Sequence, residues 1–230
     1  MKENRKELVT GIALLFAFVL WTVLIRHIDV QNAGPNGTAV GFAAFNVWFH
    51  RLTGVHMAIY TITDWLGVVP VIICMWFGLL GIVQLVKRRS LFKVDPDILL
   101  LGVYYVVVIL GYLLFEMVPI NYRPILIDGN LEASYPSSTT LLVLTVMPTL
   151  KYQSDRRIAN PVIRKAITVF VIVFAAFMVI CRLTSGVHWA TDIIGSVFLS
   201  SGLFLIYRFM AEFASQKTTQ LKAEASNGIQ

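Results

Sequence analysis

The uncharged stretch LGVVPVIICMWFGLLGIVQLV, residues 66–86, decides the class of fold. A helix needs about 20 mostly apolar residues to cross a bilayer, and this stretch is long enough. Other uncharged apolar runs occupy residues 8–25 and 98–115, and shorter ones occupy 166–181 and 193–207. A more polar run, 134–150, is counted as a further span because an even number of spans makes the charge distribution consistent. The sequence therefore predicts six transmembrane helices, at about residues 8–25, 66–86, 98–115, 134–150, 166–181 and 190–208.

The composition of the 230-residue chain also indicates a membrane protein. Hydrophobic residues make up 57% of it and charged residues only 14%, whereas soluble domains average roughly 45–50% and about 25%. A soluble single domain is therefore disfavoured, and a disordered chain is excluded. Two cysteines are too few for a disulfide-stapled secreted domain. The net charge of +6 would suggest a nucleic-acid partner, unless the positions of the charges explain it otherwise.

The basic residues are concentrated on one side of the predicted membrane. Segments 1–7, 87–97, 151–165 and 208–230 together hold 15 of the 19 lysines and arginines. The opposite side holds only four, which are Arg26, Arg51, Arg123 and Arg182. Because cytoplasmic loops are enriched in Lys and Arg, both termini are predicted to be cytoplasmic. We therefore expect an all-α integral membrane protein, with one domain over residues 1–230, in the plasma (cytoplasmic) membrane and with no nucleic-acid partner.

The segment between the first two predicted spans is too long for a simple turn. Phe42, Phe45, Phe49 and Leu52 recur in it at helical spacing. This pattern predicts an amphipathic helix that lies in the outer membrane interface, packs as a cap over the bundle, or does both.

Four polar stretches lie near the outer membrane face, at residues 121–124, 135–140, 181–182 and 188–192. The predicted topology brings all of them to the same side at a similar depth. Arg123 and Arg182 are suited to bind phosphate oxygens bidentately. A single arginine at a helix end usually only extends its charge to the interface. Two arginines together with a His–Asp pair instead indicate a functional site.

Two predicted helix starts add to this chemistry. Pro136 favours the first turn of a helix, so the backbone N–H groups of residues 137–139 are predicted to be free to bind an anion. His188 is predicted to open the last span, with Asp192 one turn later on the same face. Asp192 would then accept a hydrogen bond from one ring nitrogen and leave the other as a nucleophile or base.

These residues resemble the motifs of the type 2 phosphatidic acid phosphatase superfamily, which includes vanadium haloperoxidases and bacterial polyprenyl-diphosphate phosphatases. The family pattern is a Lys followed after six residues by Arg-Pro, then Pro-Ser-Gly-His, then Ser-Arg, five residues, His, three residues and Asp. Here the third motif reads CRLTSGVHWATD at residues 181–192, with both spacings kept. The first motif reads Arg123-Pro124, and the second reads PSST at residues 136–139.

The resemblance implies a phosphatase site that needs no metal or other cofactor. His188 would be the nucleophile that forms a phosphohistidine, and Asp192 would orient it. The groups that would hold the phosphate are Arg123, Ser137, Arg182 and the backbone N–H of Ser138.

Three positions depart from the family pattern. Cys181 replaces a Ser, Glu116 stands at the Lys position, and Thr139 replaces the His that is expected to protonate the leaving group. A phosphomonoester leaves as a basic alkoxide, for which a general acid contributes roughly 10²–10⁴-fold, whereas a diphosphate leaves as a much less basic phosphate. Thr139 therefore favours a lipid diphosphate substrate, unless Asp128 or Glu132 supplies the proton or the activity is weak.

The sequence thus predicts a membrane phosphatase that acts on a phosphorylated lipid, preferably a polyprenyl diphosphate, at the outer membrane face. Its partners would be that substrate and the surrounding membrane lipids. Two alternatives stay open: a phosphotransferase that passes phosphate from a lipid diphosphate to another acceptor, and a catalytically impaired protein that only binds a lipid phosphate. A transporter is disfavoured, because the charges gather at the outer end and not at the bilayer midplane.

Overall fold

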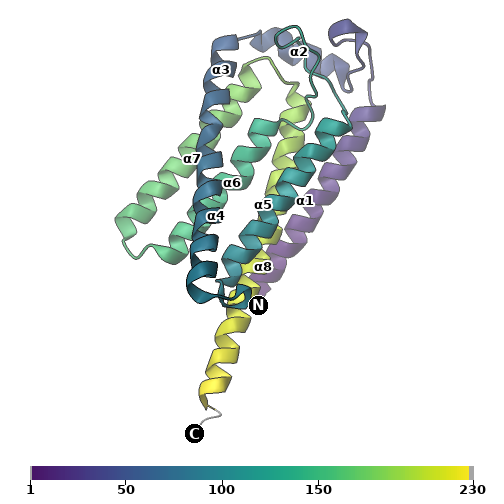
Figure 1. The fold of residues 1–230 in the computed structure, drawn as a ribbon. Coiled ribbons are helices and arrows are strands. Elements are labelled where there is room, and N and C mark those ends of the chain that lie inside the picture. Colours follow the sequence, from purple (N-terminus) through teal and green to yellow (C-terminus); the bar gives the residue numbers. More distant parts are fainter. Residues whose placement is uncertain (1, 228–230) are drawn as a thin grey trace.

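The computed structural model describes residues 2–227, with side chains for residues 5–217. Within that range six long helices run side by side (Figure 1). They are α1 (Lys2–His27), α4 (Val68–Arg88), α5 (Pro96–Met117), α6 (Ser138–Arg157), α7 (Pro161–Thr184) and α8 (Ala190–Asn227). Two shorter helices, α2 (Ala43–Thr53) and α3 (Met57–Leu66), and two 3-10 turns, η1 (Pro35–Gly37) and η2 (Leu91–Lys93), complete the described chain. The all-helical expectation is confirmed.

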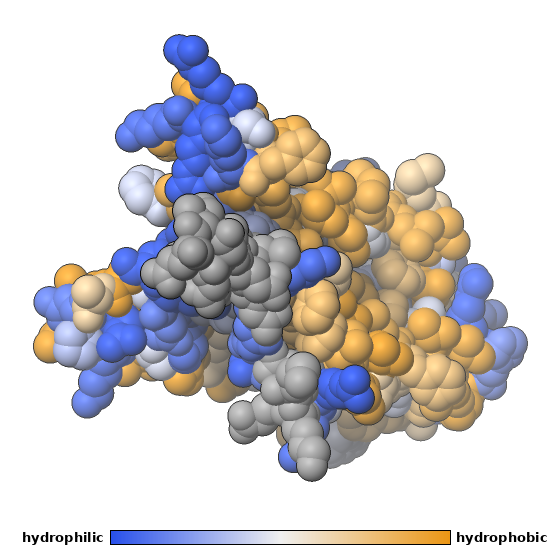
Figure 2. Space-filling view, turned by 90° about the horizontal axis from the view of Figure 1, so that it is seen from below, coloured by the Kyte–Doolittle hydropathy of each residue, from blue (hydrophilic) through white to orange (hydrophobic). Residues whose placement is uncertain are grey.

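Five helical segments of the described chain are long and apolar enough to cross a membrane. They are Arg5–His27, Met57–Arg88, Pro96–Met117, Pro161–Thr184 and Ala190–Lys217. The second of these joins α3 to α4 through Gly67, which keeps helical dihedral angles, so the apolar helix begins well before the predicted residue 66. Seen from the end that holds both termini, hydrophilic side chains gather at that end and hydrophobic ones cover much of the flank (Figure 2).

Helix α6, the most polar of the six predicted spans, is absent from those five segments, so the count of six spans stays a prediction. Its polar side chains are buried inside the bundle, among them Thr145, Thr149 and Gln153. Thr149 shares a hydrogen bond with the Tyr105 hydroxyl, and Gln153 donates one to the Tyr207 hydroxyl. Because buried polar groups are stable when neighbouring helices satisfy them, α6 does not need an apolar sequence to lie in the bundle.

The start of α6 also differs from the prediction. The helix begins at Ser138, while residues 134–137 form the end of the preceding loop and include a cis peptide bond between Tyr135 and Pro136. Pro136 therefore precedes the helix and does not occupy its first turn.

The helices alternate in direction, so both chain ends lie at the lower end of the bundle in Figure 1. The connections from α1 to α2, from α5 to α6 and from α7 to α8 lie at the upper end. Helices α1 and α8 pack closely at Gly11 and Gly202, where a Cβ on Gly202 would lie 3.1 Å from the Gly11 carbonyl oxygen. This close packing fixes α8, whose first turn carries Asp192.

Helix α2 confirms the helical spacing predicted between the first two spans. Its Phe45, Trp48 and Leu52 side chains are exposed, whereas Ala43 and Asn46 are buried. The helix packs on α8, so it caps the upper end of the bundle while presenting an apolar face outward.

Candidate functional site

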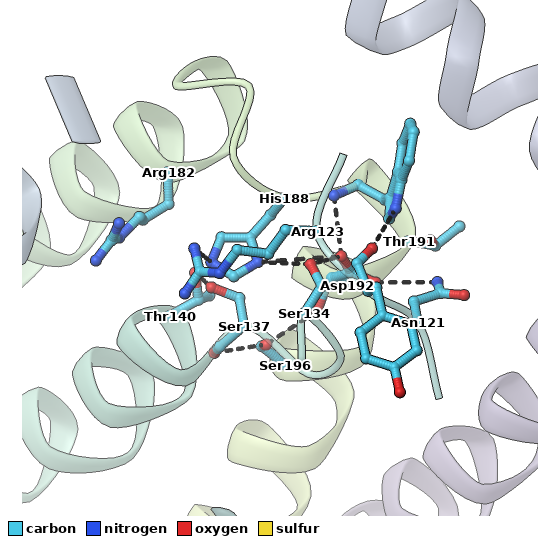
Figure 3. A network of polar contacts seen from close by, with 12 residues as sticks. Asn121, Arg123, Ser134, Ser137, Thr140, Arg182, His188, Thr191, Asp192 and Ser196 are labelled. Atoms are coloured by element: carbon cyan, nitrogen blue, oxygen red, sulfur yellow. Dashed lines mark hydrogen bonds and ion pairs between the residues drawn. The ribbon is translucent and has the colours of Figure 1, made fainter. Parts of the chain in front are cut away.

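The polar stretches singled out in the sequence meet at the upper end of the bundle (Figure 3). The loop between α5 and α6 supplies Arg123, the last turns of α7 supply Arg182, and the loop before α8 supplies His188. These side chains are buried, with residue exposures of 8%, 1% and 4%. Charged groups this deeply buried need partners or a ligand, so their surroundings define what the site can bind.

His188 and Asp192 are close but do not form the predicted direct pair. The helix begins at Ala190, so His188 lies in the preceding loop, and its Nδ1 is 4.0 Å from Asp192 Oδ2. The Ser134 hydroxyl lies between them, 3.0 Å from His188 Nδ1 and 2.5 Å from Asp192 Oδ2. The one-turn spacing thus brought the two residues to the same place, but a third residue joins them (Figure 3).

Three donors hold the Asp192 carboxylate in place. Besides the Ser134 hydroxyl, the Trp189 backbone N–H donates to it at 2.9 Å and the Asn121 side-chain amide at 3.2 Å. Asp192 is fully buried, so this set of bonds fixes the carboxylate in one orientation.

Burial strongly lowers the pKa of His188 below its usual value, and the positive charges of Arg123 and Arg182 lower it further. A backbone hydrogen bond with Ser134 acts in the opposite direction but is the smallest of these effects. The imidazole is therefore neutral at neutral pH. Its Nε2 atom faces the Arg123 guanidinium, with Nη1 at 3.5 Å.

The two arginines make different sets of contacts. Arg123 Nε lies 3.0 Å from Glu132 Oε2, although without the geometry of a hydrogen bond. Arg182 Nη2 donates to Asp64 Oδ1 at 2.9 Å and to the Thr139 hydroxyl. Within the described part of the chain, the buried Nε and Nη1 atoms of Arg182 have no hydrogen-bond partner. Both guanidinium groups lie over the Tyr60 ring, at 5.7 Å and 4.9 Å from its centroid.

Two cavities meet at this cluster. The first has a volume of about 220 Å³ and is lined by residues that include Glu116, Arg123, Glu132 and His188. The second, of about 340 Å³, is an apolar groove between α4, α5 and α6, with Asp64 and Thr139 among its lining residues. Tyr112 and Ser138 line both. A polar compartment therefore adjoins an apolar one that faces the flank of the bundle.

The structure brings most of the predicted site residues together. One of the backbone N–H groups expected to bind the phosphate is already used. The Ser137 backbone N–H was predicted to be free, but it donates to the Asp192 carbonyl at 3.4 Å. The Ser137 hydroxyl donates to Thr140. Ser138 lines both cavities, and Glu132 lines the polar one, whereas Asp128 is exposed in the loop.

Sequence reasoning missed several contributors, among them Ser134, Asp64 and Tyr60. It predicted a cap but missed the contact of α2 with the start of α8, where the buried Asn46 side chain donates to the Thr191 hydroxyl at 2.9 Å. His50 Nε2 donates to the Gly186 carbonyl at 3.0 Å, so this histidine joins α2 to the loop before α8. No local pattern indicated these contacts, because their partners lie far away in the sequence.

Comparisons with known proteins indicate the family and the fold of the chain. The PAP2 superfamily profile matches residues 96–214. A similar solved structure is the first transmembrane PAP2-type phosphatidylglycerolphosphate phosphatase from Bacillus subtilis, with a TM-score of 0.55 and 19% sequence identity. The match covers 90% of this chain and 96% of that one. A comparison with curated protein sequences found no match.

The fold defines a multi-pass membrane protein whose helices are arranged as in that solved structure. The chain belongs to the PAP2 superfamily, since the family profile covers more than half of it. This family includes phosphatases, which supports a general phosphatase activity for this chain.

Proposed function

We propose that the protein is a membrane lipid phosphatase in which His188 attacks the substrate phosphorus. The observation that carries this proposal is a buried, neutral imidazole whose Nε2 atom faces an arginine at the wall of a polar cavity. Attack forms an N–P bond as the P–O bond to the leaving group breaks. Water then hydrolyses the phosphohistidine and releases phosphate.

Two arginines and a helix start would hold the transferred phosphoryl group. Arg182 offers two buried nitrogen atoms that no other described residue pairs with, and Arg123 adjoins His188 Nε2. The N–H of Ser138, at the start of α6, adds a donor on the same side, and the Ser137 hydroxyl would add another by turning from Thr140 to the phosphate. Fixed donors in a water-poor site stabilise the charge that develops on phosphate, so the proposed mechanism uses them in place of a metal.

A lipid substrate fits the neighbouring apolar groove. The walls of this groove include Val68, Val71, Val108 and Leu142, and the groove adjoins the polar cavity at Tyr112 and Ser138. A phosphate in the cavity and a hydrocarbon tail in the groove would use both compartments at once. Thr139 lines the groove beside Ser138 and is a poor proton donor, so we favour a diphosphate, such as a polyprenyl diphosphate, whose leaving group needs little protonation.

We further propose that the site faces outward from the plasma membrane. The charge pattern supports this orientation, because 15 of the 19 basic residues lie at or near the end that holds both termini. The exposed aromatic residues of α2 would then lie in the outer headgroup region.

Phosphate release from lipid monophosphates and diphosphates by the purified protein, compared with His188→Ala, tests the proposal. We expect release by the wild type and none by the variant, with the diphosphate preferred. Full activity of the variant would contradict the assignment of His188. Transfer to an added lipid or glycan acceptor faster than to water would instead assign a phosphotransferase.

A further inference from the structure

Ser134 occupies the gap between the proposed nucleophile and its carboxylate. Its hydroxyl oxygen is 3.0 Å from His188 Nδ1 and 2.5 Å from Asp192 Oδ2, whereas those two atoms are 4.0 Å apart. A direct hydrogen bond between His188 and Asp192 is therefore not formed at this distance. The three residues lie in a row in Figure 3.

The number of protons fixes the direction of each bond. A serine hydroxyl carries one proton and two acceptor sites, and a carboxylate only accepts. Ser134 therefore donates to Asp192 and accepts from His188, which places the proton of the neutral imidazole on Nδ1. The lone pair is then on Nε2, the atom that faces Arg123 and the cavity.

The surroundings of Ser134 hold the hydroxyl in this place. The residue is 2% exposed, and its backbone N–H donates to the Asn121 carbonyl at 2.9 Å. Asn121 also donates to the other carboxylate oxygen of Asp192, so one short stretch of loop fixes both the serine and its acceptor.

We propose that Ser134 is a positioning residue that links His188 to Asp192 and selects the reactive tautomer of the histidine. This inference rests on the proposed function, in which His188 is the nucleophile. During phosphoryl transfer the N–P bond forms at Nε2, the P–O bond to the leaving group breaks, and the ring becomes positively charged. The Nδ1 proton stays on the ring, and the Ser134 hydroxyl connects that charge to the Asp192 carboxylate.

The first test compares Ser134→Ala with Ser200→Ala. Ser200 is a matched control, since it is also buried and its hydroxyl donates only to the Val197 carbonyl in its own helix. We expect Ser134→Ala to lower kcat by roughly 10- to 100-fold. KM and inhibition by inorganic phosphate should stay unchanged, because phosphate binding does not use the hydroxyl. Ser200→Ala should behave as the wild type, and Ser134→Thr, which keeps a hydroxyl, should retain most of kcat.

A double-mutant cycle with Asp192→Asn separates a link from a purely structural role. If Ser134 acts through Asp192, the double variant is about as slow as Asp192→Asn alone. If instead the double variant loses kcat by the product of the two single losses, the inference is overturned. A wild-type kcat in Ser134→Ala would also overturn it, because the backbone of Ser134 would then be enough to orient His188. Equal losses of kcat in Ser134→Ala and Ser134→Thr would overturn it as well.

The two proposals fail in different ways. Activity that survives in His188→Ala would remove the proposed nucleophile and the inference together. An inactive His188→Ala beside a fully active Ser134→Ala would remove only the role of Ser134.

Discussion

Arg182 joins Thr139 to Asp64, because its Nη2 atom donates a hydrogen bond to the side chain of each. Thr139 is the position at which the resemblance expects a histidine that protonates the leaving group. A threonine hydroxyl accepts the bond from Arg182 but does not serve as a general acid near neutral pH. Under the proposed function, the site would therefore favour leaving groups that depart without a proton.

Replacing Thr139 by His should raise the hydrolysis of lipid monophosphates much more than that of diphosphates. A general acid contributes roughly 10²–10⁴-fold where the leaving group is an alkoxide. The measurement is kcat/KM for a monophosphate and a diphosphate with the same tail, in the wild type and in Thr139→His. Equal gains on both substrates, or no gain on the monophosphate, would contradict this explanation of the substrate preference.

Glu116 lines the polar cavity at the position where the resemblance expects a lysine. Its negative charge opposes a bound phosphate, so Glu116→Lys should lower KM by roughly 2- to 5-fold, the size of an exposed charge interaction. The KM of Glu116→Gln should lie between those of the wild type and Glu116→Lys. The difference between the Lys variant and the wild type should shrink as salt increases. A higher KM in Glu116→Lys would show that this position does not face the substrate.

The pH dependence of the first step should reflect the lowered pKa of His188. Protonation removes the nucleophilic lone pair, so a lowered pKa keeps the site active at pH values below the usual 6.5. In Arg123→Gln one of the charges that lower the pKa is gone, and the acid limb should move up in pH. Rapid-quench measurement of phosphoenzyme formation against pH tests both statements. An acid limb above 6.5 in the wild type would contradict them.

The same pKa has a consequence for stability. The unfolded chain binds a proton on this histidine below about pH 6.5, and the folded site does not. The folded state therefore loses stability as the pH falls below that value.

Gly186 lets the loop before His188 pack against the turn between α2 and α3, which together cap the bundle. It has a φ of +72°, and a Cβ there would lie 2.0 Å from the Gly54 carbonyl oxygen. Gly186→Ala should therefore destabilise the protein and abolish activity. Gly129→Ala is a matched control, since Gly129 has a φ of +78° but open space around it, and should cost only about 1 kcal/mol. Thermal unfolding of both variants in the same detergent is the measurement. Equal losses would show that the contact with the cap is unimportant.

The membrane helices were predictable because their composition depends on the lipid around them. Uncharged runs indicated α1, α4, α5 and α7 correctly, with ends that differ by several residues. Helix α6 carried a weaker signal, since its neighbours and not lipid surround Thr145 and Gln153.

The site was predictable where its residues share a local spacing and unpredictable where only the tertiary fold joins them. His188 and Asp192 are four residues apart, and their proximity follows from that spacing. Ser134 is 54 residues from His188, and Asp64 is 118 residues from Arg182. The prediction that the helix starts at His188 implied a direct contact between His188 and Asp192. Because α8 begins two residues later, the two side chains are too far apart for a direct hydrogen bond, and Ser134 lies between them.

The most direct test of the central claim is to trap the phosphoenzyme. The purified protein is mixed with a lipid diphosphate labelled in its terminal phosphate, quenched in alkali within milliseconds, digested and analysed by mass spectrometry. We predict an acid-labile phosphate on the imidazole of His188, formed and lost at rates that account for turnover, and absent from His188→Ala. Turnover with no phosphate on His188, or with phosphate on another residue, would contradict the mechanism.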